Sequence, residues 1–119
     1  MTKEFKDMKG VIAIATTPFN NENLIDFESV DRLSNYYIES KVSGVTILGV
    51  MGEAHKLNIE EQKLLIKRYV NNLINSVPVI VGVSNAGLDN LELLSKFSMD
   101  SGASGVMVSG NNGLKNDDQ

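Results

Sequence analysis

The fold of this chain is decided by the stretch Gly44-Val45-Thr46-Ile47-Leu48-Gly49-Val50-Met51-Gly52-Glu53. Its first half is a nearly continuous apolar run, and a loop with two glycines and a glutamate follows at once. Strands with continuous apolar sequence are buried on both faces, which is typical of a parallel sheet covered by helices. The stretch therefore predicts a central parallel strand that ends in a glycine loop.

Three further apolar runs lie on either side of this strand in the sequence. The segments between the runs carry apolar residues at steps of three and four, which is typical of amphipathic helices. Strands are predicted at residues 10–16, 44–48, 77–83 and 103–109, and helices at 26–41, from 58 onward, and at 89–101. The order βαβαβαβ predicts an α/β fold with four parallel strands, three intervening helices and right-handed crossovers.

Two helix starts carry recognisable capping residues. Asp26 is the predicted N-cap of the first helix, and Asn58 with Glu61 resembles a capping box at the second. The predicted buried stripe of the second helix is Leu64, Leu65, Tyr69, Leu73 and Ile74. The three tyrosines are interpreted as packing residues with a hydrated hydroxyl; they are Tyr36, Tyr37 and Tyr69.

Composition excludes several classes of protein. The 119 residues include 42% hydrophobic and 22% charged residues, as in an ordinary globular protein. No stretch reaches the roughly 18 consecutive apolar residues of a membrane span, and the start of the chain has no apolar signal core. A net charge of −4 without a basic stripe argues against nucleic-acid binding. With no cysteine in the chain, we expect a cytoplasmic protein without disulfides.

Candidate site residues gather where parallel strands should end. The loop Gly49 to Glu53 follows a strand directly, and Ser84 with Asn85 follows the next one. Two roles are equally weighted for Ser84 and Asn85: lining the mouth of a binding site, and capping the helix that follows. His55 is the only histidine, and a surface loop residue is favoured over an acid or base role. One histidine and no cysteine predict no metal site, and no cofactor is expected.

Four segments together resemble one known family. They are Thr17-Pro18-Phe19 after the first strand, the Gly-x-x-Gly-Glu loop Gly49 to Glu53, Leu57 with Glu60-Glu61, and the third strand Pro78 to Val83. In this order and spacing they resemble the dihydrodipicolinate synthase / N-acetylneuraminate lyase family. The resemblance implies a TIM (β/α)8 barrel, of which this chain is the N-terminal part.

The resemblance also implies a chemistry. Family members are class I aldolases or lyases in which a lysine on the sixth strand forms a Schiff base with pyruvate or another 2-oxo acid. A tyrosine after the fifth strand relays protons, and the Gly-x-x-Gly-Glu loop holds the substrate carboxylate. Carried over to this chain, the substrate-binding residues are Gly49, Val50, Met51, Gly52, Glu53 and Thr17. None of these is a catalytic residue, because the strands with the lysine and the tyrosine lie beyond this sequence.

Two departures from the family pattern indicate a divergent subgroup. The middle loop positions are usually hydroxyl residues but are Val50 and Met51 here, so that only their backbone N–H groups are able to bind an anion. Many members have a tyrosine after the fourth strand, whereas Ser109 to Gly113 contains no aromatic residue. The Glu53 carboxylate is expected to accept hydrogen bonds from nearby backbone amides.

The whole of residues 1–119 is interpreted as a single incomplete barrel segment. Asn116 to Gln119 resembles the N-cap and first turn of a helix that follows the fourth strand. Two unpaired sheet edges predict self-association, and the chain alone is expected to be inactive. The alternative is a non-catalytic α/β module that binds a small carboxylate or phosphate at Gly49 to Glu53 and Ser84-Asn85.

Overall fold

The computed structural model of the chain describes residues 9–109. In chain order its elements are β1 (Ile12–Ile14), α1 (Phe27–Glu39), β2 (Gly44–Ile47), the 3₁₀ turn η2 (Ala54–Lys56), α2 (Ile59–Leu73), β3 (Val79–Gly82), α3 (Leu88–Ser101) and β4 (Gly105–Met107). The four strands form one parallel sheet in the order β1-β2-β3-β4. The predicted strand and helix order is therefore confirmed. The predicted helix start at Asn116 to Gln119 lies outside the described residues.

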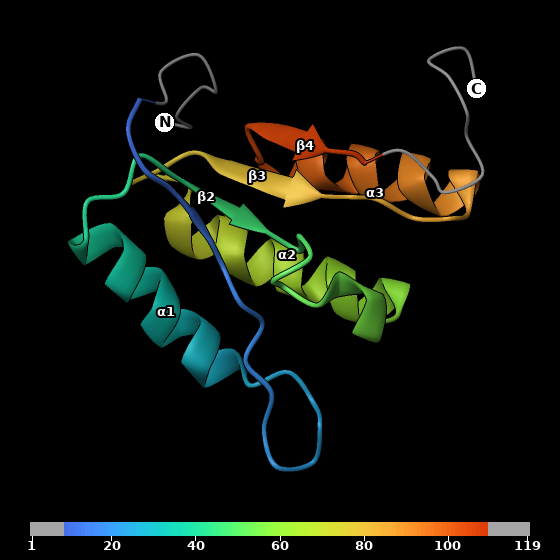
Figure 1. Ribbon diagram of the computed structural model, residues 1–119, viewed down its shortest axis with the longest axis horizontal. Helices are drawn as coiled ribbons and strands as arrows, with labels where there is room; N and C mark the ends of the chain where they lie inside the picture. The colour runs from blue at the N-terminus through green and yellow to red at the C-terminus, as the bar shows by residue number, and fades with distance from the viewer. Residues whose placement is uncertain (1–8, 110–119) are drawn as a thin grey trace.

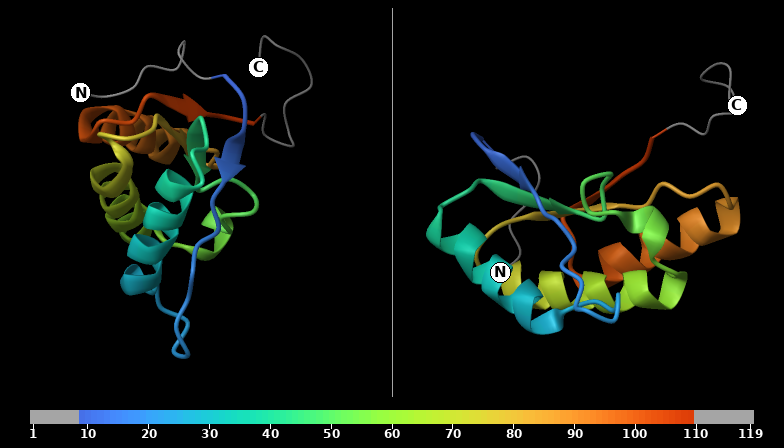
Figure 2. Two further views of the ribbon diagram at one scale, coloured as in Figure 1. Left: turned by 90° about the vertical axis from the view of Figure 1, so that its left-hand side faces the viewer. Right: turned by 60° about the horizontal axis from the view of Figure 1, so that its bottom comes forward.

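The three helices cover one face of the sheet, and no helix or strand of residues 9–109 covers the other face (Figure 1; Figure 2). Side chains alternate along each strand, so partners in the parallel register share a face. Val45 is paired with Val79 and Ile47 with Val81, and all four belong to the buried core between sheet and helices. Thr46 and its partner Ile80 consequently lie on the opposite face.

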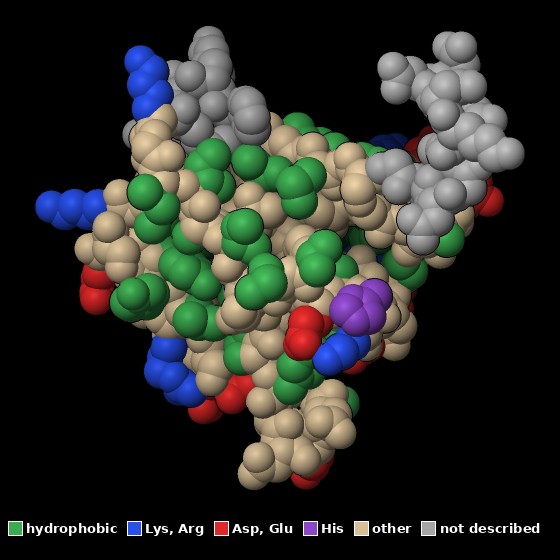
Figure 3. Space-filling model, viewed as in Figure 1, with side chains coloured by type: hydrophobic (Ala, Val, Ile, Leu, Met, Phe, Trp, Pro, Cys, Tyr) green, Lys and Arg blue, Asp and Glu red, His purple; other side chains and the backbone are tan. Residues whose placement is uncertain are grey.

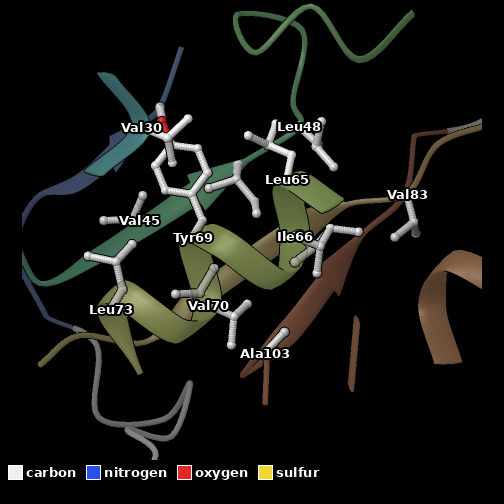
Figure 4. Packing of buried hydrophobic residues seen from close by; sticks show 14 of the residues in the cluster. Val30, Val45, Leu48, Leu65, Ile66, Tyr69, Val70, Leu73, Val83 and Ala103 are labelled. Carbon is white, nitrogen blue, oxygen red and sulfur yellow. The ribbon is translucent and has the colours of Figure 1, made fainter. Parts of the chain in front are cut away.

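Helix α2 is the centre of the core, with α1 on one side of it and α3 on the other (Figure 4). Its fully buried apolar residues are Leu65, Ile66, Tyr69, Val70 and Leu73. The prediction was wrong for Leu64, whose side chain is 57% exposed. It was also wrong for the hydroxyl of Tyr69, which is buried and donates a hydrogen bond of 2.9 Å to the carbonyl oxygen of Thr16.

Both predicted helix caps are confirmed. The Asp26 carboxylate accepts a hydrogen bond of 3.1 Å from the backbone N–H of Ser29. Asn58 and Glu61 form a reciprocal capping box, in which each side chain accepts a hydrogen bond from the backbone N–H of the other residue. These bonds satisfy donors at the first turn that have no partner within the helix, and so they fix where α1 and α2 begin.

The central and outer strands differ sharply in burial. All residues of β2 and β3 are buried, as continuous apolar strands predict, whereas β1 and β4 have exposed side chains. The outer strands are also shorter than the predicted runs 10–16 and 103–109. Among the described residues each outer strand has one neighbour, and the strand is limited to the part of each run that pairs with that neighbour. Within residues 9–109, no helix is long and apolar enough to cross a membrane.

Candidate functional site

The loop Gly49 to Glu53 lies at the carboxyl end of β2, at the edge of the sheet where β3 also ends. It consists of two overlapping turns, because Gly52 N–H donates to the Gly49 oxygen at 3.1 Å and Glu53 N–H to the Val50 oxygen at 3.0 Å. Leu48 and Glu53 bracket the loop and both have positive φ values, 56° and 57°. Residues other than glycine seldom adopt this left-handed backbone conformation, so the backbone here is held in an unusual shape.

The two glycines of the loop have different roles. A Cβ atom on Gly52 would lie 3.0 Å from the backbone nitrogen of Leu48 and 3.3 Å from the carbonyl oxygen of Ala15, so a larger residue there would push these backbone atoms away by a few tenths of an ångström. A Cβ atom on Gly49 would meet only the end of the Met107 side chain, at 3.7 Å. The closest approach involves β3, where a Cβ atom on Gly82 would lie 2.3 Å from the Leu48 oxygen.

Thr17 connects the end of the first strand to the same loop. Its side chain is 6% exposed, and its hydroxyl donates a hydrogen bond of 2.6 Å to the carbonyl oxygen of Gly52. The hydroxyl proton is therefore used to hold the loop. Thr17 is brought to the predicted site, but within residues 9–109 its contact is with the loop backbone, which gives it a positioning role.

The middle of the loop presents two free donors. The backbone N–H groups of Val50 and Met51 have no hydrogen-bond partner in the part of the chain that the structure describes. The side chains of both residues stand out from the surface and are 87% and 62% exposed. Adjacent backbone N–H groups at a turn form a concave positive surface that binds anions, so the loop is able to receive a carboxylate.

A hollow of about 180 Å³ adjoins the loop. It lies between the loop and the carboxyl ends of β3 and β4, and its walls combine apolar side chains with hydroxyls and one imidazole. The lining residues are Leu48, Gly49, Val50, Ala54, His55, Gly82, Ser84, Met107 and Ser109. In size it matches one small molecule of a few heavy atoms, rather than a drug-sized ligand.

Two charged residues flank the hollow without lining it. The Glu53 carboxylate accepts a hydrogen bond of 2.9 Å from the ammonium group of Lys56, three residues later. The expected bonds from backbone amides are absent for this carboxylate within residues 9–109. His55 is exposed, as predicted, and borders the hollow. Among the described residues, no three acidic or histidine side chains lie close enough to hold a metal ion.

Ser84 and Asn85 separate into two roles. The Ser84 hydroxyl lies in the wall of the hollow, where it pairs with the Ser109 hydroxyl at 2.9 Å and accepts a bond from the Ser109 N–H at 2.8 Å. The Asn85 side chain accepts a hydrogen bond from the Gly87 N–H at 2.9 Å, which forms a turn before α3. The N-cap of α3 is Gly87, so neither residue caps the helix directly.

Several residues of the site were missed at the sequence level. Met107 and Ser109 reach the hollow because β4 lies beside β3, and the signal was their position at the end of a predicted strand. Gln62 was also missed. Its side chain is buried in α2 and donates hydrogen bonds to the carbonyl oxygens of Ala54 and Leu57, at 3.3 and 3.1 Å. It thereby fixes the turn that follows the loop.

Comparison with known proteins identifies the family. The model described as the dihydrodipicolinate synthetase family matches residues 7–110 of the chain. The chain belongs to this family. The 4-hydroxy-tetrahydrodipicolinate synthase of Thermosipho africanus is 31% identical over 100 residues, and that of Thermotoga petrophila is 35% identical over 100 residues. Each alignment covers 84% of this chain and 34% of the relative, so this dihydrodipicolinate synthetase family chain spans about a third of the curated relatives' length.

Solved structures agree with this assignment. The dihydrodipicolinate synthase of Rhodopseudomonas palustris superposes with a TM-score of 0.91 at 40% identity and covers 99% of this chain and 39% of its own. The N-acetylneuraminate lyase of Proteus mirabilis, at 22% identity and a TM-score of 0.81 over 86% of this chain and 35% of its own, shows the fold alone. The predicted fold, the N-terminal part of a (β/α)8 barrel, is confirmed. Nothing in these comparisons supports the alternative of a free-standing binding module.

Proposed function

We propose that this chain forms the carboxylate-binding part of a lyase or aldolase that acts on pyruvate or another 2-oxo acid through a lysine Schiff base. The observation that carries the proposal is the pair of free N–H groups at Val50 and Met51, at the carboxyl end of a barrel strand. Active sites of such barrels lie at this end of the strands. A 2-oxo acid fits the small adjoining hollow, with its carboxylate on the two N–H groups.

The lysine of this proposal lies outside the chain. Among the described lysines, only Lys56 lies near the carboxyl ends of the strands, and its ammonium group is paired with Glu53. Its side chain is 56% exposed, whereas a Schiff-base lysine has to lose its proton and is helped by a desolvated position. The chain alone is therefore proposed to be inactive. One relative supports the substrate class, because a prophage protein of the family from E. coli K12 was solved in complex with pyruvate.

The test is a chimaera that supplies the remaining strands. Residues 9–109 replace the matching third of the Rhodopseudomonas palustris protein, which superposes closely on this chain. The chimaera is incubated with a series of 2-oxo acids and a reducing agent, and trapped adducts are counted by intact mass. We expect one adduct per chain with at least one of these acids. A folded chimaera that traps none of them would contradict the proposal.

A pair of variants in the chimaera isolates the role of the loop. Val50 is the second residue of the turn that starts at Gly49, a position where proline is favoured, and its N–H has no partner within the described residues. Val50→Pro therefore removes one anion donor with little cost to folding, while Val50→Ala keeps that donor. A hydrogen bond to a charged group contributes about 1.5–3 kcal/mol. The acid concentration for half-maximal trapping should rise roughly 10- to 100-fold in Val50→Pro and little in Val50→Ala.

Two further predictions belong to this proposal. Self-association through the sheet edges is expected because, within residues 9–109, the outer edges of β1 and β4 have no strand partner. A cytoplasmic location stays a prediction, which fractionation of cells expressing the chain would check.

A further inference from the structure

Both edges of the sheet lack the features that normally prevent pairing. Within residues 9–109, β1 and β4 each have a single neighbour, so a row of backbone groups on each has no strand partner there. Natural edge strands are usually protected by charged side chains, by proline or by bulges. Residues 10–17 and 103–109 contain no charged residue and no proline. The two edges are therefore suited to pairing with another strand.

The open face of the sheet is apolar beside both edges. Ile12 and Ile14 of β1 are 39% and 57% exposed, and Met107 of β4 is 47% exposed. The register places all three on the face away from the helices, because Ile14 is aligned with Thr46 and Met107 with Gly82. Figure 3 shows hydrophobic side chains gathered on this face, with charged side chains at its rim. Such a surface is costly to leave in water.

We propose that the 119-residue chain forms a two-fold symmetric pair in which two four-stranded sheets close one eight-stranded barrel. All four strands run in the same direction and in sequential order. In this pair, β4 of one copy pairs in parallel with β1 of the other and forms a seam. A two-fold rotation about the barrel axis then generates a second, identical seam between the remaining β4 and β1. Closure then requires two copies, because two sets of four strands make eight. In an eight-stranded barrel the side chains fill the interior and leave no channel.

Charge permits this arrangement. The net charge of each copy is −4, which opposes association of like chains in general. No acidic residue lies in either edge segment, however, and in the closed pair the helices with their charged surfaces point outward. The loops Gly49 to Glu53 of both copies would lie at the same end of the barrel, since the strands are parallel throughout. Later strands of a longer chain would compete for the same edges, and the test therefore uses the 119-residue chain.

The first test is sedimentation of the chain across a range of concentrations. We expect a single species of twice 13.0 kDa. Ile14→Lys puts a charge at each of the two identical seams, and Leu64→Lys is the matched control, because both side chains are 57% exposed and Leu64 lies on α2. Ile14→Lys should be monomeric with unchanged circular dichroism, whereas Leu64→Lys should remain paired. A monomeric parent chain, or a ladder of open oligomers, would overturn the proposal.

Cross-linking tests which strands meet, without breaking the seam. The chain has no cysteine, so single substitutions report without background. Ile14→Cys mixed with Met107→Cys and treated with a mild oxidant should give a disulfide-linked dimer, because both side chains face the barrel interior from strands that lie side by side at the seam, and a disulfide spans only about 4.4–6.8 Å between Cα atoms. Either variant alone should give little dimer, since like strands stand on opposite sides of the closed barrel. Dimers that form equally well within a single variant would refute the barrel and indicate like-to-like edge pairing.

Discussion

The contact between Gly82 and the backbone at Leu48 gives the sharpest prediction on stability. A Cβ atom at position 82 would lie 2.3 Å from the Leu48 oxygen and 2.9 Å from its carbonyl carbon. Gly82→Ala must push these backbone atoms away by about 1 Å to reach an ordinary close contact of about 3.3 Å. Overpacking of a buried site costs about 1–3 kcal/mol, and the upper end applies because the neighbours are backbone atoms.

The matched control is Gly49→Ala, where the added Cβ atom would meet only the flexible end of Met107, at 3.7 Å. Urea unfolding, followed by circular dichroism at one protein concentration, measures both variants. With a urea m-value of about 1.5 kcal/mol per M, a loss of about 3 kcal/mol lowers the midpoint of Gly82→Ala by about 2 M. The Gly49→Ala midpoint should move by less than about 0.5 M. Equal midpoints for the two variants would refute the close packing of β3 against the loop.

Three other predictions concern single interactions. Tyr69→Phe leaves the Thr16 oxygen without its 2.9 Å donor and should lower the free energy of unfolding by about 1–2 kcal/mol. Burial also raises the pKa of Tyr69. The folded chain thus keeps a proton that the unfolded chain loses near pH 10, and stability should fall above that pH in the parent but less in Tyr69→Phe. Asn58→Ala removes one half of the capping box and should cost about 1 kcal/mol in urea unfolding, whereas Asn58→Asp should cost little. The hydrogen bonds from Arg68, and then from Asn72, lower the pKa of Asp31 to about 2. The stability that they contribute is present above about pH 4 and is lost as the pH falls towards 2. Arg68→Gln should flatten this acid loss, measured by melting temperature against pH, and Lys63→Gln, at the looser 3.9 Å pair with Glu60, should leave it unchanged.

The elements of the fold were predictable because local signals agreed with each other. Asp26, Asn58 and Glu61 fixed two helix starts, and their side chains make the predicted bonds. Continuous apolar sequence indicated burial on both faces for β2 and β3, where the structure confirms it. The same signal overestimated β1, because burial there depends on a neighbouring strand that the sequence pattern does not reveal.

The candidate site was predictable in position but not in detail. Because parallel strands end at one edge, the loop after β2 and Ser84 after β3 were expected to lie close together, and Gly49, Val50 and Ser84 do line one hollow. Thr17 bonds to the Gly52 oxygen and Glu53 to Lys56 beside a left-handed backbone position at Glu53, and no residue type announces such a position when it is not glycine. The exposure of Leu64 was also not predictable from the sequence, because it depends on how α2 is rotated against the neighbouring elements.

The most direct test of the central claim is borohydride trapping of the 119-residue chain with pyruvate, followed by intact mass. The claim is that this chain carries the carboxylate loop of a family barrel without the lysine that performs the chemistry. We predict no adduct on chain shown to be folded by circular dichroism, and adduct formation once the remaining strands are supplied. A mass increase of one reduced pyruvate on the chain alone, with Lys56 or another lysine modified, would contradict the claim.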